Sequence, residues 1–414
     1  MSNISEKLFV LVGFLILHLR PAIPGQLFGG FYLIGTVAFM AILFYLDRKV
    51  LLKEKSFFIF WYILLLGYLL FSSMNSSENF VQGIKTVVID VFPLCWFSVM
   101  TPRRGYVFLK SFVNFFYYLT LSALVSYTLI LLFDIRLELL KVNLETIAGR
   151  TNYIFTMYFP FTFVYSSESY FLGLNFPRFI GFFREPGILQ VLLIFSYYIV
   201  GLFFKGFKAL KYKLVLFLGF FLTFSTAGFI GFFVSETLRI LFYSDVGHRF
   251  KLFKRSFFIM LAVFVSIGFY YVLFESELSF NVAAKMSRNS GASRVASIFT
   301  SLEYFRLKPL FGYGLFYFGE PAPFENVNLI TALSEIGAFG VGFVILGYII
   351  LLMKSFKARS VAFLIGINLF LLVLLSQPIY LLPISFFILT ILWFLTNNAD
   401  TLEEQRRVGA DVIC

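Results

Sequence analysis

The segment with the clearest potential for chemistry is Arg178-Phe-Ile-Gly-Phe-Phe-Arg184-Glu185-Pro186-Gly187. It sets two arginines six residues apart around a glycine and places a carboxylate beside the second. The planar guanidinium fork fits phosphate oxygens better than the point charge of lysine does. A guanidinium pair next to a carboxylate can therefore bind a phosphate-bearing lipid and handle a proton.

A simpler interpretation of the same segment also stays open. Proline is well suited to the first turn of a helix, so Glu185 would lie at or just before a helix N-terminus, where the dipole stabilises negative charge. Glu185 would then be only a helix cap, and Arg178 and Arg184 would reach for lipid headgroups. Basic residues of membrane proteins usually concentrate on the cytoplasmic side. The topology argued below places these two arginines on the outer side, and this exception favours anion binding.

A second segment, residues 275–327 and the start of the apolar run after it, carries further candidates. They are Lys285, Arg288, Arg294, Gly312, Tyr313, Gly314, Asn326 and Glu335. Residues 293–306 have the spacing of a surface helix that begins at Arg294 and that Pro309 ends. The Gly-Tyr-Gly turn lets the backbone approach a ligand closely, although an ordinary tight turn is an equally good interpretation.

Two carboxylates fall inside apolar runs. Glu335 lies about two and a half turns into the run 328–352, and Asp90 lies in the run 84–100. A charge there is either partnered by a basic group or functional. We expect a structural partner for Asp90 and keep Glu335 among the candidates.

The elements that must position these residues follow from composition. Of 414 residues, 60% are hydrophobic, 14% are charged and 61 are phenylalanine. Repeated apolar runs of about 17–25 residues have the length of transmembrane helices. The sequence thus predicts an all-α polytopic membrane protein, a single membrane domain over 1–414 with about twelve spans. The expected spans are 8–19, 26–46, 56–73, 84–100, 111–133, 187–204, 213–226, 227–243, 256–274, 328–352, 361–376 and 379–396.

Two regions required a choice. Residues 213–243 could form one long span, but the flanking lysine clusters favour two short arms that meet at Ser225-Thr226-Ala227-Gly228. Residues 151–167 are apolar enough to span, but counting them would move a basic loop outside. We therefore expect 134–186 to be one outer loop that dips into or lies on the membrane and is interrupted at Pro160.

The net charge of +12 does not indicate a nucleic-acid partner. Most of the basic residues lie in short loops between apolar runs, where they fix topology. Those loops and both termini fall on one side, which is expected to be cytoplasmic, with 397–414 as a cytoplasmic tail. The large loops 134–186 and 275–327 face the exterior. Cys95 and Cys414 form no disulfide framework, no set of residues has metal-ligand spacing, and we assign no role to His18 or His248.

Four features in order resemble the Wzy-type O-antigen polymerase family and the related O-antigen ligases. They are Arg178…Gly181…Glu185-Pro186-Gly187, the 225–228 hairpin, Arg294 followed by Pro309-Leu-Phe-Gly312-Tyr-Gly314, and Asn326…Glu335-Ile-Gly337. The two large outer loops and the twelve-span layout resemble the family as well. Each motif is short, and their order and spacing carry the resemblance.

The resemblance implies a GT-C-like, inverting and metal-independent glycosyltransferase of the bacterial inner membrane, needing no cofactor and active on the outer face. It would move a glycan from undecaprenyl pyrophosphate onto a lipid-linked repeat unit in lipopolysaccharide biosynthesis. Arg178 and Arg294 would bind the pyrophosphate, with Arg184, Arg288 and Lys285 as weaker candidates for the same task. Glu185 would accept the acceptor's proton or orient that sugar. A chain-length regulator is a further partner that the resemblance leaves open.

The chain also departs from the family pattern. Ligases usually carry a His-Asn pair where this chain has Glu325-Asn326, which favours a polymerase over a ligase. The base assignment stays open between Glu185, Glu325 and Glu335. Thr226 stands where the hairpin often has an arginine. A flippase or other transporter is a further alternative, although the charges lie in outer loops and no internal repeat is visible.

Overall fold

The protein is mostly helical. The computed structural model describes residues 2–19, 22–46, 56–75, 77–144, 153–171, 174–183, 185–223, 225–242, 289–318, 328–375, 383–398 and 401. The helices there are α1 (Ser2–Leu17), α2 (Ile23–Leu27), α3 (Gly29–Leu46), α4 (Ser56–Ser72), α5 (Ser77–Ser98), α6 (Pro102–Phe133), α7 (Pro186–Phe203), α8 (Gly206–Leu222), α9 (Thr226–Phe242), α12 (Asn289–Leu307), α13 (Leu333–Lys357), α14 (Ala362–Leu375) and α15 (Pro383–Asn397).

Among the described residues, five helices are long and apolar enough to cross a membrane. They are α3, α5 from Asn79 to Ser98, α6, α7 and α13. Three shorter apolar helices, within α4, α14 and α15, accompany them. Every predicted span that falls within the described residues coincides with a helix, and the span 256–274 lies outside them. The expectation of a helical membrane protein is confirmed at this level.

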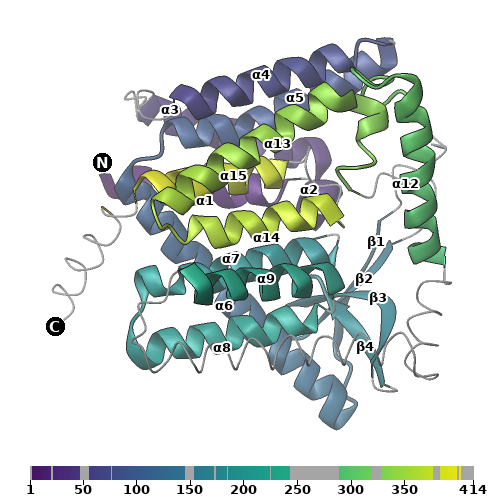
Figure 1. Ribbon diagram of the computed structural model, residues 1–414. Coiled ribbons are helices and arrows are strands. Elements are labelled where there is room, and N and C mark those ends of the chain that lie inside the picture. The colour runs from purple at the N-terminus through teal and green to yellow at the C-terminus, as the bar shows by residue number, and fades with distance from the viewer. Residues whose placement is uncertain are drawn as a thin grey trace.

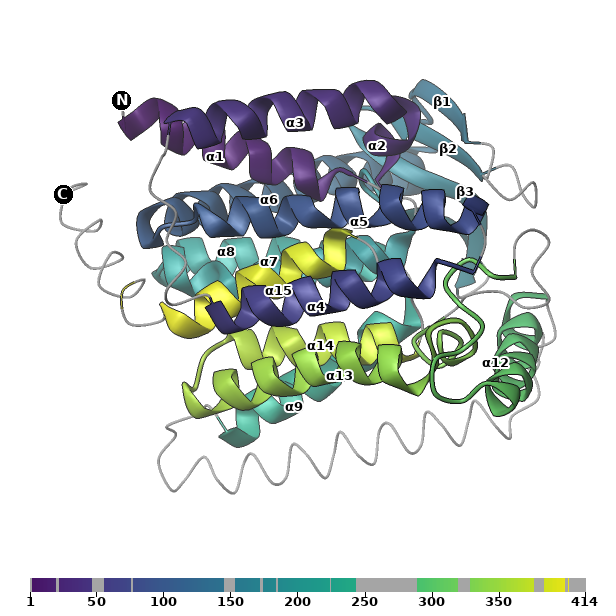
Figure 2. The ribbon, with the colours of Figure 1, turned by 90° about the horizontal axis from the view of Figure 1, so that it is seen from above.

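The long helices lie side by side, and the two ends of the bundle differ (Figures 1 and 2). One end, the short-loop end, holds the start of α1, the end of α15 and the connections 99–101, 204–205 and 358–361. The opposite end, the sheet end, holds α2, α12 and a β-sheet. Helix α9 ends at the short-loop end, and α12 lies at the sheet end.

Helices α8 and α9 form a hairpin. The chain leaves the helical conformation at Thr223 and re-enters it at Thr226. The ring centroids of Phe220 and Phe229 lie 4.6 Å apart, and those of Phe217 and Phe232 lie 5.7 Å apart, as expected for antiparallel neighbours. The prediction of two arms in place of one long span is confirmed.

A four-stranded antiparallel sheet replaces the irregular outer loop expected over 134–186. Its strands are β1 (Glu138–Leu144), β2 (Tyr153–Tyr158), β3 (Thr162–Phe171) and β4 (Leu174–Phe179), in chain order. The prediction of helices alone missed this sheet, because 151–167 was judged by its hydropathy. Pro160 lies in the tight turn between β2 and β3, where a residue without an N–H removes no ladder hydrogen bond.

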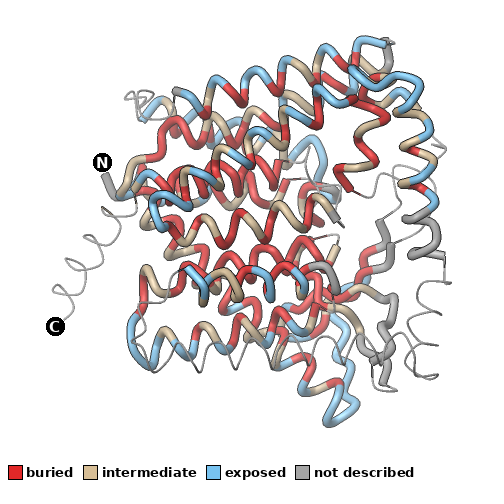
Figure 3. The backbone as a smooth tube through the Cα atoms, viewed as in Figure 1, coloured by how far each residue is buried: buried red, intermediate tan, exposed pale blue. Residues whose placement is uncertain are grey.

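Two helices form the centre of the bundle. In the apolar stretch of α7, 83% of the residues are buried, whereas only 17% are buried in the apolar stretch of α3. Helix α15 is buried from Pro383 to Thr396. Figure 3 shows this contrast as continuous red on the inner helices and pale blue on the outer ones. A helix that is apolar all round belongs in such a position, and α7 begins one residue after Glu185.

Candidate functional site

Strand β4 carries Arg178 to the sheet end of the bundle, where the side chain is half-buried. Its Nε donates a hydrogen bond to the carbonyl of Thr223 at 3.3 Å. Thr223 is the C-cap of α8, so this bond ties the outer segment to the hairpin break. The hydroxyl of Tyr127 on α6 donates to the carbonyl of Pro177, which holds the same strand from the other side.

Glu185 is the N-cap of α7, and Pro186 takes the first helical position, as the sequence predicts. Its side chain makes no capping hydrogen bond, so the simple cap interpretation lacks its usual contact. The helix dipole nevertheless favours a negative charge at this N-terminus. Gly181 makes the turn before it with a φ of +56°, a conformation that L side chains rarely adopt.

Two backbone contacts fix the turn between β4 and α7. The N–H of Ile23 donates to the carbonyl of Phe182 at 2.8 Å, and Ala22 forms a bridge with Phe183. The ring of His18 packs against Phe183, with centroids 5.9 Å apart. His18, to which the sequence gave no role, thus lies beside the motif segment. Its position at the end of the first predicted span is the only sequence feature that places it at this end of the bundle.

The hairpin break also packs onto α7. A Cβ added at Gly228 would lie 1.7 Å from the Oε1 atom of Gln190, so a larger residue there would displace the Gln190 side chain. Gln190 follows Glu185 by little more than one helical turn. The arginine-carboxylate segment and the 225–228 hairpin, separate in sequence, therefore share one neighbourhood.

A second neighbourhood forms around Gly312-Tyr313-Gly314. The N–H of Tyr313 donates to the carbonyl of Ser334 at 2.9 Å, and that of Gly314 donates to the carbonyl of Glu335 at 2.8 Å. A Cβ at Gly312 would lie 2.4 Å from the Glu335 carbonyl oxygen. The close approach that this turn permits is thus to the protein's own backbone, not to an open ligand groove.

Glu335 lies in the first turn of α13 and is buried, so its predicted position well inside a span is wrong. The apolar run begins at 328, but residues 328–332 form turns before the helix starts at Leu333. Gly337 then interrupts the helix with a φ of +63° and a ψ of −176°. The hydroxyl of Tyr68 on α4 donates to the carbonyl of Ile336 at 2.6 Å and secures the break.

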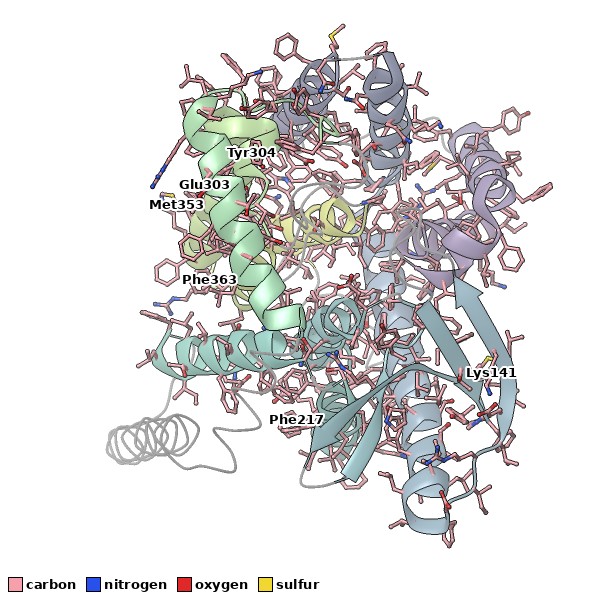
Figure 4. All side chains as sticks on the ribbon, turned by 90° about the vertical axis from the view of Figure 1, so that its right-hand side faces the viewer. Lys141, Phe217, Glu303, Tyr304, Met353 and Phe363 are labelled. Atoms are coloured by element: carbon pink, nitrogen blue, oxygen red, sulfur yellow. The ribbon has the colours of Figure 1, made fainter. Side chains whose placement is uncertain are left out.

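Aromatic rings gather beside this turn in what we call the tyrosine cluster, namely Tyr304, Tyr313, Tyr317 and Phe318. The ring centroids of Tyr304 and Tyr313 are 5.8 Å apart, and those of Tyr313 and Tyr317 are 5.0 Å apart. The Nζ of Lys308 lies 4.4 Å from the centroid of the Tyr313 ring. Figure 4 views the sheet end and shows Tyr304 on α12. The sequence placed these tyrosines outside but could not show that they cluster.

The surface helix expected over 293–306 is present as α12, which begins at Asn289 instead of Arg294. The Oγ of Ser301 donates to the carbonyl of Thr331 at 2.9 Å and ties α12 to the segment before α13. Arg294 lies in α12, but its side chain is not described. Lys285, Arg288, Arg184, Glu325 and Asn326 lie outside the described residues.

Asp90 on α5 is fully buried, and neither of its carboxylate oxygens has a hydrogen-bond partner among the described residues. The structural partner expected for it is therefore not found there. The hydroxyl of Tyr62 donates instead to the backbone carbonyl of Asp90. We have no physical account of this carboxylate.

The described residues contain no group of three or more His, Cys, Asp or Glu side chains suited to a metal ion. No protein-family model and no curated protein matches the chain. The site is therefore interpreted from its own geometry.

Proposed function

We propose that this protein is an O-antigen-type polysaccharide polymerase of the bacterial inner membrane. It would transfer a glycan from undecaprenyl pyrophosphate onto a lipid-linked repeat unit, with inversion at the anomeric carbon and without a metal or another cofactor. The observation that carries the proposal is the half-buried Arg178, anchored to the α8–α9 break beside the N-terminus of α7, where Glu185 lies. An arginine at the end of an apolar bundle suits a lipid-borne phosphate.

In the proposed reaction, the guanidinium of Arg178 binds the pyrophosphate oxygens, and Arg294 assists it. The bond between the anomeric carbon and the phosphate oxygen breaks, and undecaprenyl pyrophosphate leaves with the electron pair. The acceptor hydroxyl bonds to the anomeric carbon from the opposite face and gives its proton to Glu185. The fixed positive charge stabilises the negative charge that develops on the leaving group. The donor supplies its own activation, so no nucleotide site is needed.

The proposal includes a GT-C-like arrangement of twelve spans with both termini in the cytoplasm. The basic connections at the short-loop end support it, since short cytoplasmic loops are rich in lysine and arginine. Examples are Arg103 beside the 99–101 connection, Lys205 in 204–205 and Arg359 in 358–361. The sheet end, with Arg178 and Glu185, would then face the exterior.

The tyrosine cluster would bind the growing glycan. Tyrosine combines a flat apolar ring, which suits the C–H face of a sugar, with a hydroxyl that can hydrogen-bond. Backbone bonds from Tyr313 and Gly314 to the start of α13, and from Leu315 to Ser72, hold the cluster's loop in place. An interfacial aromatic belt would need no such fixed loop.

The decisive experiment is reconstitution of the purified protein with a synthetic repeat unit on undecaprenyl pyrophosphate. A polymerase yields a ladder of products that differ by one repeat. A ligase yields nothing without its lipid A-core acceptor, and a flippase moves the substrate without lengthening it. The ladder should persist in EDTA, and a loss of product that one divalent ion restores would contradict the metal-independent mechanism.

A further inference from the structure

Large apolar side chains remain exposed where α6 meets the sheet. This surface, which we call the apolar foot, consists of Leu131, Leu132, Phe133, Ile135, Leu137, Leu139, Leu140, Phe159 and Phe161. Leu132 is 75% exposed and Phe161 is 64% exposed. Exposed apolar side chains gathered where two elements meet mark an interaction site, since contact with water disfavours them. It comprises the end of α6, the stretch 135–140 and the turn between β2 and β3.

The length of α6 determines how deep in the bilayer the foot lies. The helix has 32 residues, so it is about 48 Å long at a rise of about 1.5 Å per residue. A bilayer's hydrocarbon core is about 30 Å thick. Measured from Ser111, where the predicted span 111–133 begins, Leu131 to Phe133 lie about 30–33 Å along the helix, at the outer limit of the core. In Figure 1 the C-terminal part of α6 projects from the bundle beside the sheet.

Two serine hydroxyls on α6 attach the turn between β2 and β3 to that helix. The Oγ of Ser126 donates to the carbonyl of Phe159 at 2.6 Å, and the Oγ of Ser122 accepts from the N–H of Phe161 at 3.0 Å. Ser122 and Ser126 lie about 17 and 23 Å along the helix from Ser111. The β2–β3 turn therefore lies within the depth of the predicted span, where the exposed rings of Phe159 and Phe161 can reach acyl chains.

The foot continues an apolar flank of the bundle. Tyr118, Val125 and Leu132 are spaced by seven residues on one face of α6 and are 63%, 46% and 75% exposed. Phe133 and Ile135, which follow Leu132, are also exposed, and the hydroxyl of Thr128 on the same stretch donates to the carbonyl of Leu124. A surface that would face lipid tails on α6 thus extends into the sheet region.

The charges beside the foot are paired. Arg136 lies 3.7 Å from Asp134, and Lys141 lies 2.9 Å from Glu138. The hydrogen bond with Glu138 raises the pKa of Lys141. Paired charges add no net attraction for anionic lipid. Contact with the membrane would therefore depend on apolar burial more than on lipid charge.

We infer that the apolar foot is a membrane-docking surface that rests in the outer leaflet of the bilayer. Its leucine and phenylalanine side chains reach the acyl region, while the Asp134–Arg136 and Glu138–Lys141 pairs lie among the headgroups. The sheet is then fixed on the membrane surface, and β4 with Arg178 is held near the height of lipid phosphates. This inference stands on exposure and geometry and does not depend on the proposed function.

Fluorescence quenching in reconstituted bilayers tests the inference. Leu132→Cys and Phe161→Cys are each placed in a protein that also carries Cys95→Ser and Cys414→Ser, and are labelled with a small thiol-reactive fluorophore. Tyr118→Cys is the lipid-facing control on α6, and Glu303→Cys on α12 is the water-facing control at the same end (Figure 4). Emission is compared in lipids with and without brominated acyl chains, and with aqueous iodide.

Labels at positions 132 and 161 should lose as much emission to brominated lipid as the label at 118, in zwitterionic and in anionic bilayers alike. Iodide should quench them far less than it quenches the label at 303. Two outcomes would overturn the inference. One is quenching by iodide but not by lipid, which places the foot in water. The other is protection from both quenchers, which indicates that protein covers it.

Discussion

At the scale of single residues, Arg178 makes a structural contact in addition to the chemical role proposed for it. Its Nε donates to the Thr223 carbonyl, which uses one of the five donors of a guanidinium. That contact fixes where the planar group lies relative to the α8–α9 break. Lysine has no second nitrogen along its chain, so it cannot keep this contact and also present a fork to phosphate.

Arg178→Ala should therefore lower polymer formation by about 100-fold or more, because a positioned donor for the departing charge is lost. Arg178→Lys should recover little of that loss. The readout is ladder formation with the reconstituted protein, alongside thermal unfolding in detergent. Arg136→Ala is the matched control, since Arg136 is an exposed arginine in the same outer segment. Normal ladders from Arg178→Ala would remove Arg178 from the mechanism.

Glu185→Gln tests the carboxylate while keeping the size of the side chain. Removing the negative charge should cost about 0.3–1 kcal/mol of its interaction with the dipole of α7, which thermal unfolding measures. Loss of a general base should lower the turnover number by about 100-fold, while binding of the lipid-linked donor changes little. Single-turnover rates and donor binding are measured separately. If turnover is unaffected, the base is another carboxylate, and Glu335→Gln becomes the next variant.

Tyr317→Ala tests glycan binding by the tyrosine cluster. Tyr317 is 48% exposed, so its removal should cost little stability. A lost stacking contact should raise the KM for the acceptor and shorten the products, with little change in the rate at saturating acceptor. Tyr45→Ala is the control, because Tyr45 is an exposed tyrosine near the C-terminal end of α3, at the short-loop end of the bundle. Equal kinetics for both variants would exclude Tyr317 from glycan binding.

At the scale of secondary structure elements, hydropathy predicted the helices well and the outer segments poorly. A run such as 361–376 needs only enough apolar residues to become a helix, and α14 follows it closely. In 151–167, strand pairing decides the structure, and residues such as Phe155 and Val164 are buried through partners on neighbouring strands. Single-sequence hydropathy carries no information about such partners.

In the candidate site too, features set by the local sequence were predictable, and contacts between distant segments were not. Glu185 at a helix N-terminus followed from Pro186, which is a local signal. The contact between Arg178 and Thr223 joins residues 45 positions apart, and no local pattern encodes it. The Gly312–Gly314 turn was recognised, but its partner was not, because the backbone of Glu335 approaches from a different element.

Gly312→Ala should destabilise the protein through the contact between this turn and α13. Alanine would adopt a φ of +69° and place its Cβ 2.4 Å from a carbonyl oxygen. We expect a cost of about 1–3 kcal/mol for the backbone conformation, with the clash added. Gly342→Ala on α13 is the matched control, since nothing lies within 4 Å of its Cβ position. That change should stabilise the helix by about 0.5–1 kcal/mol. Equal unfolding temperatures for both variants would contradict the described contact.

At the scale of the whole molecule, the two ends of the bundle differ in their secondary structure and in the length of their connections. The short-loop end has brief connections with flanking lysine and arginine residues, whereas the sheet end carries a sheet, a surface helix and the candidate site. Short basic loops stay in the cytoplasm, while longer segments cross the membrane largely regardless of charge. This asymmetry is the reason for our proposal that the sheet end faces the exterior.

Thiol labelling in intact bacterial cells tests that orientation. Lys205→Cys at the short-loop end and Glu303→Cys at the sheet end are made in a protein that also carries Cys95→Ser and Cys414→Ser; both positions are exposed. A membrane-impermeant maleimide should label position 303 in intact cells. It should label position 205 only after the inner membrane is permeabilised. The reverse pattern would place Arg178 and Glu185 in the cytoplasm, where a glycan polymerase of the outer leaflet could not work.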